Sequence, residues 1–249
     1  MDLFEFFEMY NEAAIAFSGG VDSTYLLYAA VKHGALVKAY YVKSPFQPEF
    51  ELQDAKKIAS QFNVELEVLE VDVLSIPSVL SNPCDRCYHC KKYMFQQITK
   101  AAARDGFSII LDGTNASDKL SERPGMQALL ELGIESPLRE AGLTKEDVRR
   151  LSKEANLPTW DKPAYACLAT RIPTGTTITP ERLKKTELAE SYLASLGFTD
   201  FRIRLMGDTG KIQVSSNQLE LLLQHRSEIL IELKKYYESV VLDLEVRGE

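Results

Sequence analysis

The stretch AAIAFSGGVDS, residues 13–23, decides the fold of this chain. Its residues 15–17 form a compact apolar run that is typical of a buried parallel strand. Apolar residues return at helical spacing in 24–32, so Gly19 and Gly20 lie where a strand passes into a helix. Glycine adopts left-handed dihedrals and leaves backbone N–H groups open to an anion, which the following helix N-terminus also attracts. The stretch therefore predicts a pyrophosphate-binding turn, the alternative being an ordinary glycine turn at a helix start.

Serine hydroxyls extend the anion-binding character of this turn, because Ser18 and Ser23 can each donate a hydrogen bond. Asp22 cannot bind phosphate by itself, since like charges repel, so we assign it to a magnesium ion or to the charge of the helix N-terminus. The chain has no G-x-x-x-x-G-K-[ST] motif, which excludes a Walker-type nucleotide site. The residues expected to form the pyrophosphate site are Ser18, Gly19, Gly20, Val21, Asp22 and Ser23.

The sequence SGGVDS, residues 18–23, resembles the PP-loop signature of the ATP pyrophosphatases. This resemblance implies binding of ATP with Mg²⁺ and cleavage between the α and β phosphates. Such enzymes transfer AMP to a carbonyl or carboxylate oxygen of the acceptor and release pyrophosphate. A nucleophile then displaces AMP. The signature is specific for the superfamily and does not identify the acceptor.

Strands and helices alternate through the first half of the chain. We expect strands at 13–17, 36–42, 64–71 and 107–112, with helices at 22–33, 48–62 and 88–105. This order predicts an α/β fold with a doubly wound parallel sheet. Ligands of such sheets bind beyond the carboxyl ends of the strands, where residues 18–23, 41–44 and 113–115 all fall. Gly113 and Thr114 are therefore expected in the nucleotide site.

The second half has a different pattern. Prolines recur through residues 118–180 and separate short helices such as 144–155. We interpret this part as the connecting segment that carries the acceptor site. Beyond it we expect helices at 181–196 and 216–238 and strands at 200–206, 210–215 and 239–246. We predict a PP-loop domain with the acceptor segment over residues 1–175 and a small α+β domain over residues 176–249.

Composition narrows the protein class. A hydrophobic share of 45% is ordinary for a globular core. The N-terminus is acidic and lacks a leader pattern, and no window is long and apolar enough to cross a membrane, so we expect a cytoplasmic protein without a membrane partner. A formal net charge of −7 argues against a broad nucleic-acid surface, which favours a small molecule over tRNA and no stable nucleic-acid partner.

Three cysteines are clustered, since Cys84, Cys87 and Cys90 form C-x2-C-x2-C and Cys167 lies far downstream. In a cytosolic chain this pattern indicates metal or redox chemistry before structural disulfides. Four thiolates could hold a structural zinc ion. Three could hold an iron–sulfur cluster with one open iron, which is the interpretation we favour. In the third alternative all four stay reduced and Cys167 alone is reactive.

Longer runs carry a narrower resemblance; they are RCYHCK (86–91), DGTNASD (112–118), ERPGMQAL (122–129), ESPLREAGLTKEDVRRL (135–151) and LPTWDKPAYACLATRIPTG (157–175). With SGGVDS they resemble the LarE-type ATP-dependent sulfur transferases over most of residues 1–215. The resemblance implies adenylation of the carboxylates of pyridinium-3,5-biscarboxylic acid mononucleotide and their conversion to thiocarboxylates. That reaction serves biosynthesis of the nickel-pincer nucleotide cofactor of lactate racemase. The resemblance also implies a homo-oligomer and sulfide or another sulfur donor as partner.

The family uses two sulfur sources. In one type a single cysteine, matching Cys167, attacks the acyl adenylate and gives up its sulfur to become dehydroalanine. In the other type, cysteines matching Cys87, Cys90 and Cys167 hold a [4Fe-4S] cluster whose open iron can carry an extra sulfide. This chain has all three cysteines, so we expect the cluster type, with the sacrificial type as the alternative. Cys84 lies outside the family run and could be a fourth ligand.

Three arginines complete the expected site. The expected catalytic residues are Cys167, Asp22 and Arg171. Arg171, four residues past Cys167, is the candidate cation for the pyrophosphate, with an ordinary surface arginine as the alternative. Arg202 and Arg204 alternate on one strand and so project from one face, which suits a mononucleotide phosphate as well as a solvated surface. The chain departs from the family pattern near here, with Met206 and Gln213 at the positions of a family histidine and glutamate.

Two other functions stay open. One is a tRNA thiolation enzyme of the same superfamily, which also combines a PP-loop with cysteine chemistry. The other is a zinc-stabilised nucleotide-binding module without turnover.

Overall fold

The computed structural model describes residues 1–119 and 124–247. Contacts divide the chain into two compact units: the first contains residues 1–75 and 85–162, and the second contains residues 76–84 and 163–249. The domain boundary expected at residues 175/176 stays a prediction. The first two residues of the run 122–129 lie outside the described residues.

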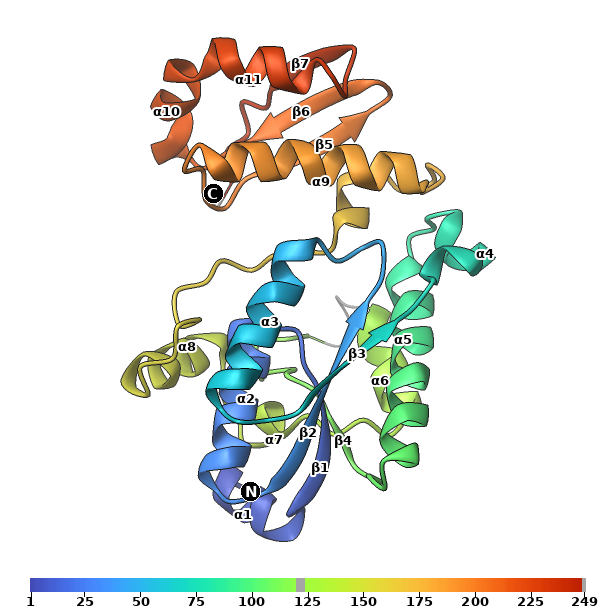
Figure 1. Ribbon diagram of the computed structural model, residues 1–249, viewed down its shortest axis with the longest axis vertical. Coiled ribbons are helices and arrows are strands. Elements are labelled where there is room, and N and C mark those ends of the chain that lie inside the picture. The colour runs from blue at the N-terminus through green and yellow to red at the C-terminus, as the bar shows by residue number, and fades with distance from the viewer. Residues whose placement is uncertain (120–123, 248–249) are drawn as a thin grey trace. The chain divides into compact units, whose positions relative to one another are not determined.

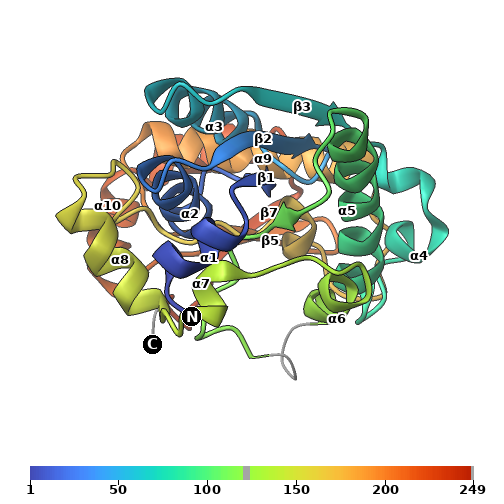
Figure 2. The ribbon, with the colours of Figure 1, turned by 90° about the horizontal axis from the view of Figure 1, so that it is seen from below.

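The first unit is built on a parallel sheet. Its strands are β1 (Glu12–Ala16), β2 (Leu36–Lys43), β3 (Leu66–Glu70) and β4 (Ile110–Leu111). They lie in the order β3-β2-β1-β4, and every pairing is parallel. Figure 2 shows the four strands side by side. The predicted α/β class with a parallel sheet is confirmed, although the strand expected at 107–112 is reduced to two residues.

Helices cover both faces of this sheet. They are α1 (Leu3–Met9), α2 (Val21–Lys32), α3 (Glu49–Gln61), α5 (Arg86–Arg104), α6 (Pro124–Glu131), α7 (Pro137–Glu140) and α8 (Lys145–Glu154), with the 3₁₀ turn η1 (Val73–Ser75). One face is covered by α2 and α3, and the other by α5 and α6 (Figures 1 and 2). The arrangement is therefore doubly wound, as expected.

The middle of β1 is apolar on both sides because both faces of the sheet are covered. Ala13, Ala14 and Ile15 are all fully buried. Ala13 and Ile15 belong to one hydrophobic core with Leu26 and Leu27 of α2. A continuous apolar run is the pattern of a strand buried on both faces, which explains why the sequence revealed β1 so clearly.

The second unit contains a smaller sheet. Its strands are β5 (Arg202–Met206), β6 (Thr209–Gln213) and β7 (Ser239–Leu242). β6 is antiparallel to β5 and parallel to β7. Its helices are α4 (Pro77–Leu80), α9 (Pro180–Ser195), α10 (Leu219–Gln224) and α11 (Arg226–Leu233), with the 3₁₀ turns η3 (Leu168–Arg171) and η4 (Ser216–Gln218).

Two expected elements of the second unit differ from the structure. The single helix expected at 216–238 is divided into η4, α10 and α11, with a break at His225, whose ψ of 6° is not helical. Leu222 and Ile229 are nevertheless both buried, so the apolar period continues across the break and conceals it in the sequence. The strand expected at 239–246 ends at Leu242, where Asp243 pairs with Lys211 instead.

Among the described residues, no helix is both long and apolar enough to cross a membrane.

Candidate functional site

The strand order of the first unit brings two loops to one place. β2 lies on one side of β1 and β4 on the other, so the chain changes direction between β1 and β4. Doubly wound sheets bind ligands in the crevice beyond the carboxyl ends of the strands at such a point. The loop 17–20 follows β1 here, and the loop 112–115 follows β4.

Hydrogen bonds between serines and glycines hold the loop after β1. The Oγ atoms of Ser18 and Ser23 lie 3.0 Å apart, and Ser23 Oγ donates to the Gly20 carbonyl over 3.3 Å. Gly19 has a φ of +69°, and a Cβ there would lie 3.1 Å from the backbone of Ala55. This position therefore requires glycine. The loop presents N–H groups and hydroxyls at the N-terminus of α2, which is the geometry of an anion site.

A cavity of about 330 Å³ opens beside this loop, entirely within the first unit. Met94, Phe95 and Ile98 of α5 provide an apolar wall. The lining also includes residues that the sequence placed there: Ser18, Gly20, Asp22, Ser23, Tyr41, Val42, Gly113 and Thr114. The three predicted segments thus meet at one cavity whose volume suits a small ligand. The Val21 side chain packs in the core as the first residue of α2.

Asp22 is bonded to two side chains from distant segments. Lys145 Nζ lies 2.5 Å from Asp22 Oδ2, and Asn115 Nδ2 lies 3.2 Å from Oδ1. Lys145 is the first residue of α8, and its backbone N–H donates to Ser117 Oγ over 2.9 Å. Sequence reasoning missed Lys145, although it lies within the run 135–151. Nothing local in the sequence identifies a partner that is 123 residues away.

The loop after β4 approaches the start of α2 closely. A Cβ at Gly113 would lie 2.9 Å from the backbone nitrogen of Ser23, so glycine permits this approach. Thr114 Oγ1 donates to the buried carboxylate of Asp112 over 2.5 Å, and Ser136 Oγ donates to the same group over 2.6 Å. These bonds hold the loop 112–115 close to the start of α2.

Cys87 and Cys90 lie three residues apart near the start of α5 and therefore on one face of that helix. Cys87 is exposed, with its Sγ 3.7 Å from Arg86 Nη2. Cys90 is buried, and its Sγ lies 3.5 Å from Met94 Sδ. Cys84 is exposed and belongs to the second unit. Over residues 1–119 and 124–247, no group of three or more His, Cys, Asp or Glu side chains is gathered so as to hold a metal ion.

Cys167 directly precedes η3 in the second unit and is half-buried. The fully buried Arg171 donates to the carbonyls of Ala166 and Cys167 over 2.5 and 3.2 Å. It also forms a bidentate pair with Glu190 of α9, with both distances 2.9 Å. Burial alone would lower the pKa of Arg171, but hydrogen bonding and attraction by Glu190 raise it. Arg171 therefore holds the Cys167 turn, and its expected role toward pyrophosphate stays a prediction.

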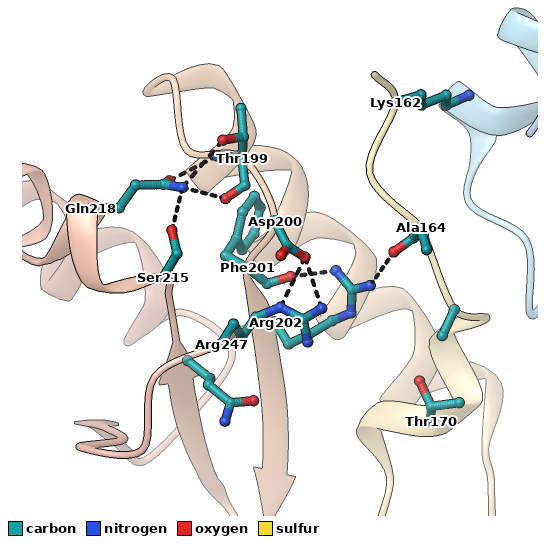
Figure 3. A network of polar contacts seen from close by, with 12 residues as sticks. Lys162, Ala164, Thr170, Thr199, Asp200, Phe201, Arg202, Ser215, Gln218 and Arg247 are labelled. Atoms are coloured by element: carbon teal, nitrogen blue, oxygen red, sulfur yellow. Dashed lines mark hydrogen bonds and ion pairs between the residues drawn. The ribbon is translucent and has the colours of Figure 1, made fainter. Parts of the chain in front are cut away.

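Arg202 and Arg204 of β5 lie beside the same segment. Arg202 is buried and donates to the carbonyls of Ala164 and Phe201 over 2.8 and 2.6 Å, as Figure 3 shows. Arg204 donates to the carbonyl of Thr170 over 3.2 Å. The structure thus brings both predicted arginines to the segment 164–170 that contains Cys167.

Positive charge accumulates around Arg202. Burial, followed by repulsion from Arg171 and Arg247, lowers the pKa of the Arg202 guanidinium to about 10. Arg247 is itself paired with Asp200 over 2.7 Å (Figure 3). Glu190 pairs with Arg171 and Asp200 pairs with Arg247, so carboxylates offset part of this positive charge.

Comparison with known proteins first identifies the class of enzyme to which the chain belongs. The sequence matches the family of the queuosine biosynthesis protein QueC over residues 12–81, which include β1, the pyrophosphate loop and α2. The tRNA-specific 2-thiouridylase MnmA of Thermotoga petrophila is 25% identical over 59% of this chain and 52% of its own length. With the parallel sheet and the SGGVDS loop, these matches define an ATP-using enzyme of the PP-loop class.

Two relatives extend over nearly the whole chain. An uncharacterized protein of Synechocystis is 36% identical over 98% of this chain and 92% of its own length. The pyridinium-3,5-bisthiocarboxylic acid mononucleotide synthase of Lactiplantibacillus plantarum is 33% identical over 94% of this chain and 86% of its own length. The chain therefore belongs to the LarE family and is an ATP-dependent sulfur transferase. The resemblance inferred from the sequence is confirmed.

Proposed function

We propose that the chain adenylates the carboxylates of pyridinium-3,5-biscarboxylic acid mononucleotide and converts them to thiocarboxylates, for the nickel-pincer nucleotide cofactor. The observation that carries this proposal is the 33% identity, over 94% of the chain, to an enzyme named for the bisthiocarboxylic product. The pyrophosphate loop and its cavity supply the site for the first half of this reaction. The two arginines of β5, which both donate to the segment that carries Cys167, support a phosphate-bearing substrate.

The first half-reaction uses the loop after β1. A substrate carboxylate oxygen attacks the α-phosphorus of ATP, and pyrophosphate leaves with the electrons of the broken α–β bond. The N–H groups and hydroxyls of residues 18–23 bind the leaving pyrophosphate at the N-terminus of α2. Asp22 would hold Mg²⁺, which would offset the charge of the phosphates. Lys145, which pairs with Asp22 in the structure, would place a second cation beside them.

The second half-reaction needs a sulfur nucleophile. A thiolate or hydrosulfide attacks the acyl adenylate, and AMP leaves with its bridging oxygen. Cys87, Cys90 and Cys167 would hold a [4Fe-4S] cluster, for which thiolates are the preferred ligands. Cys87 and Cys90 lie on one face of α5, which suits two ligands of the same cluster. When bound, this group supplies an open iron that can carry the sulfide. In the alternative, Cys167 itself attacks and gives up its sulfur.

Arg202 and Arg204 bind the mononucleotide phosphate in this proposal. Both belong to β5 and donate to the segment 164–170, so a phosphate held there lies near Cys167 in the second unit. A sulfide or other sulfur donor and a homo-oligomeric assembly complete the proposal.

The activity is tested by pyrophosphate release and mass spectrometry. The wild type with Mg-ATP and pyridinium-3,5-biscarboxylic acid mononucleotide should release pyrophosphate and form thiocarboxylate. Cys167→Ala should still release pyrophosphate but form no thiocarboxylate, because adenylation precedes sulfur transfer. The proposal fails if the wild type releases no more pyrophosphate with this substrate than without it.

The sulfur source is tested by anaerobic purification with iron, sulfide and zinc analysis of the wild type, Cys84→Ala and Cys87→Ala. About four irons, retained in Cys84→Ala and lost in Cys87→Ala, would support the three-cysteine cluster. A protein without iron would leave Cys167 as sacrificial donor. Stoichiometric zinc without turnover would favour a zinc-stabilised module.

A second candidate function is tRNA thiolation, which the similarity to the tRNA-specific 2-thiouridylase favours. The formal net charge of −7 counts against it, because tRNA binding depends on phosphate contacts. Retention of tRNA at moderate salt, with thiolation of the bound tRNA, would establish this alternative.

A further inference from the structure

Lys162, the last residue of the first unit, reaches back to the pyrophosphate loop. Its Nζ donates to the Gly19 carbonyl over 3.2 Å and to Asp54 Oδ2 of α3 over 2.7 Å. The Lys162 side chain is only 21% exposed. It lines a second cavity, of about 320 Å³, together with Lys57 and Thr159. The reaction described above uses none of these contacts.

The contact fixes the direction of one peptide group in the loop. A trans peptide is planar, so the Gly19 carbonyl and the Gly20 N–H point in opposite directions. Lys162 holds the carbonyl on its own side, while the Gly20 N–H donates to Ser18 Oγ over 3.4 Å. Ser18 and Gly20 both line the nucleotide cavity. Because glycine has little conformational preference of its own, the direction of this N–H depends on such a partner.

The backbone around Lys162 is held by α8. Arg149 donates from Nη1 to the Trp160 carbonyl over 2.7 Å and from Nη2 to the Lys162 carbonyl over 2.8 Å. Hydrogen bonds from a charged donor are stronger than neutral ones. The same helix carries Lys145, the partner of Asp22. Lys162 therefore projects from a segment that is anchored independently of the loop.

We propose that Lys162 is a positioning residue of the ATP site, which aims the Gly20 N–H at the pyrophosphate through the Gly19 carbonyl. This inference rests on the proposed ATP-dependent function of the loop.

The test compares Lys162→Met with Lys162→Arg and with Lys57→Met. Lys57 is an exposed lysine of α3 that lines the same second cavity, so its variant controls for lost charge nearby. Binding of the α,β-methylene analogue of ATP is measured by calorimetry, and unfolding midpoints are recorded for each variant. Lys162→Met should bind the analogue about tenfold more weakly, while Lys162→Arg should recover most of the affinity because it can still donate. Lys57→Met should match the wild type.

Equal affinity of the wild type and Lys162→Met would overturn the proposal, as would an equal loss in Lys57→Met. If Lys162→Met does not fold, Lys162→Leu provides the same comparison with a shorter side chain that cannot donate a hydrogen bond. Failure of the wild type itself to bind the analogue would contradict the proposed function of the loop, and the proposal with it.

Discussion

Arg171 and Glu190 form an ion pair inside the second unit, with their side chains 0% and 5% exposed. Glu190 also accepts hydrogen bonds from Tyr165 Oη and from the backbone N–H of Ile203. Removing charges from water is costly, so a buried pair is stable only while each partner remains. At the scale of single residues, the Cys167 turn therefore depends on a carboxylate that lies on α9.

Glu190→Gln tests this dependence. It leaves the Arg171 charge buried without its partner and should lower the free energy of unfolding by about 3 to 5 kcal/mol. Glu154→Gln, on α8, removes a pair with Arg150 in which both side chains are exposed, and it should cost less than about 1 kcal/mol. Urea unfolding followed by circular dichroism measures both. Similar losses in the two variants would contradict the importance of the buried pair.

At the scale of elements, helix caps position two site segments. Thr144 caps α8 in a reciprocal box with Asp147, directly before Lys145. Thr179 caps α9 by accepting from the N–H of Arg182. Both caps satisfy an N–H group that the first helical turn leaves without an intrahelical partner. The two caps lie in different units, so mutation of one serves as the control for mutation of the other.

Thr144→Ala and Thr179→Ala should each destabilise the protein by about 1 kcal/mol, as loss of a cap does. Only Thr144→Ala should also raise the KM for ATP in pyrophosphate release, since it loosens the helix start that carries Lys145. Steady-state kinetics and urea unfolding separate the two effects. An unchanged KM in Thr144→Ala would mean that Lys145 is positioned without the cap.

At the scale of the whole molecule, acid should reduce stability through a charge cluster at the edge of the large sheet. Hydrogen bonds from Arg104, Lys38 and Tyr40 hold the pKa of Asp105 well below its usual range. Arg104 and then Lys38 likewise lower the pKa of Glu67. A carboxylate with a depressed folded-state pKa contributes stability above its unfolded pKa of about 4 and loses that stability as the pH falls.

The free energy of unfolding should therefore stay level down to about pH 5 and decline below about pH 4. In Asp105→Asn this decline should be shallower, because one of the depressed carboxyl groups is gone. Glu8→Gln, which alters an exposed carboxyl on α1, is the control and should keep the wild-type slope. Urea titrations at stepwise pH values measure the slopes. Parallel curves for wild type and Asp105→Asn would contradict this assignment.

Sequence reasoning was most successful where the physical cause is local. The apolar run of β1, the glycine turn and the helical period of α2 predicted the parallel sheet and the position of the turn between β1 and α2. Expectations were wrong where tertiary contacts decide the outcome. Helix 216–238 breaks at His225 although its apolar period continues, and the strand at 107–112 shortens to Ile110–Leu111.

The sequence by itself determined the class of this protein, because a strand, an SGGVDS turn and a helix are specified by neighbouring residues. Only the tertiary structure decided which side chains meet that turn. Lys145 and Lys162 reach it from 123 and 143 residues away, and Arg171 pairs with Glu190 instead of remaining exposed. Such pairings arise when the sheet and its helices close around one core, and no local periodicity records which distant charges then come into contact.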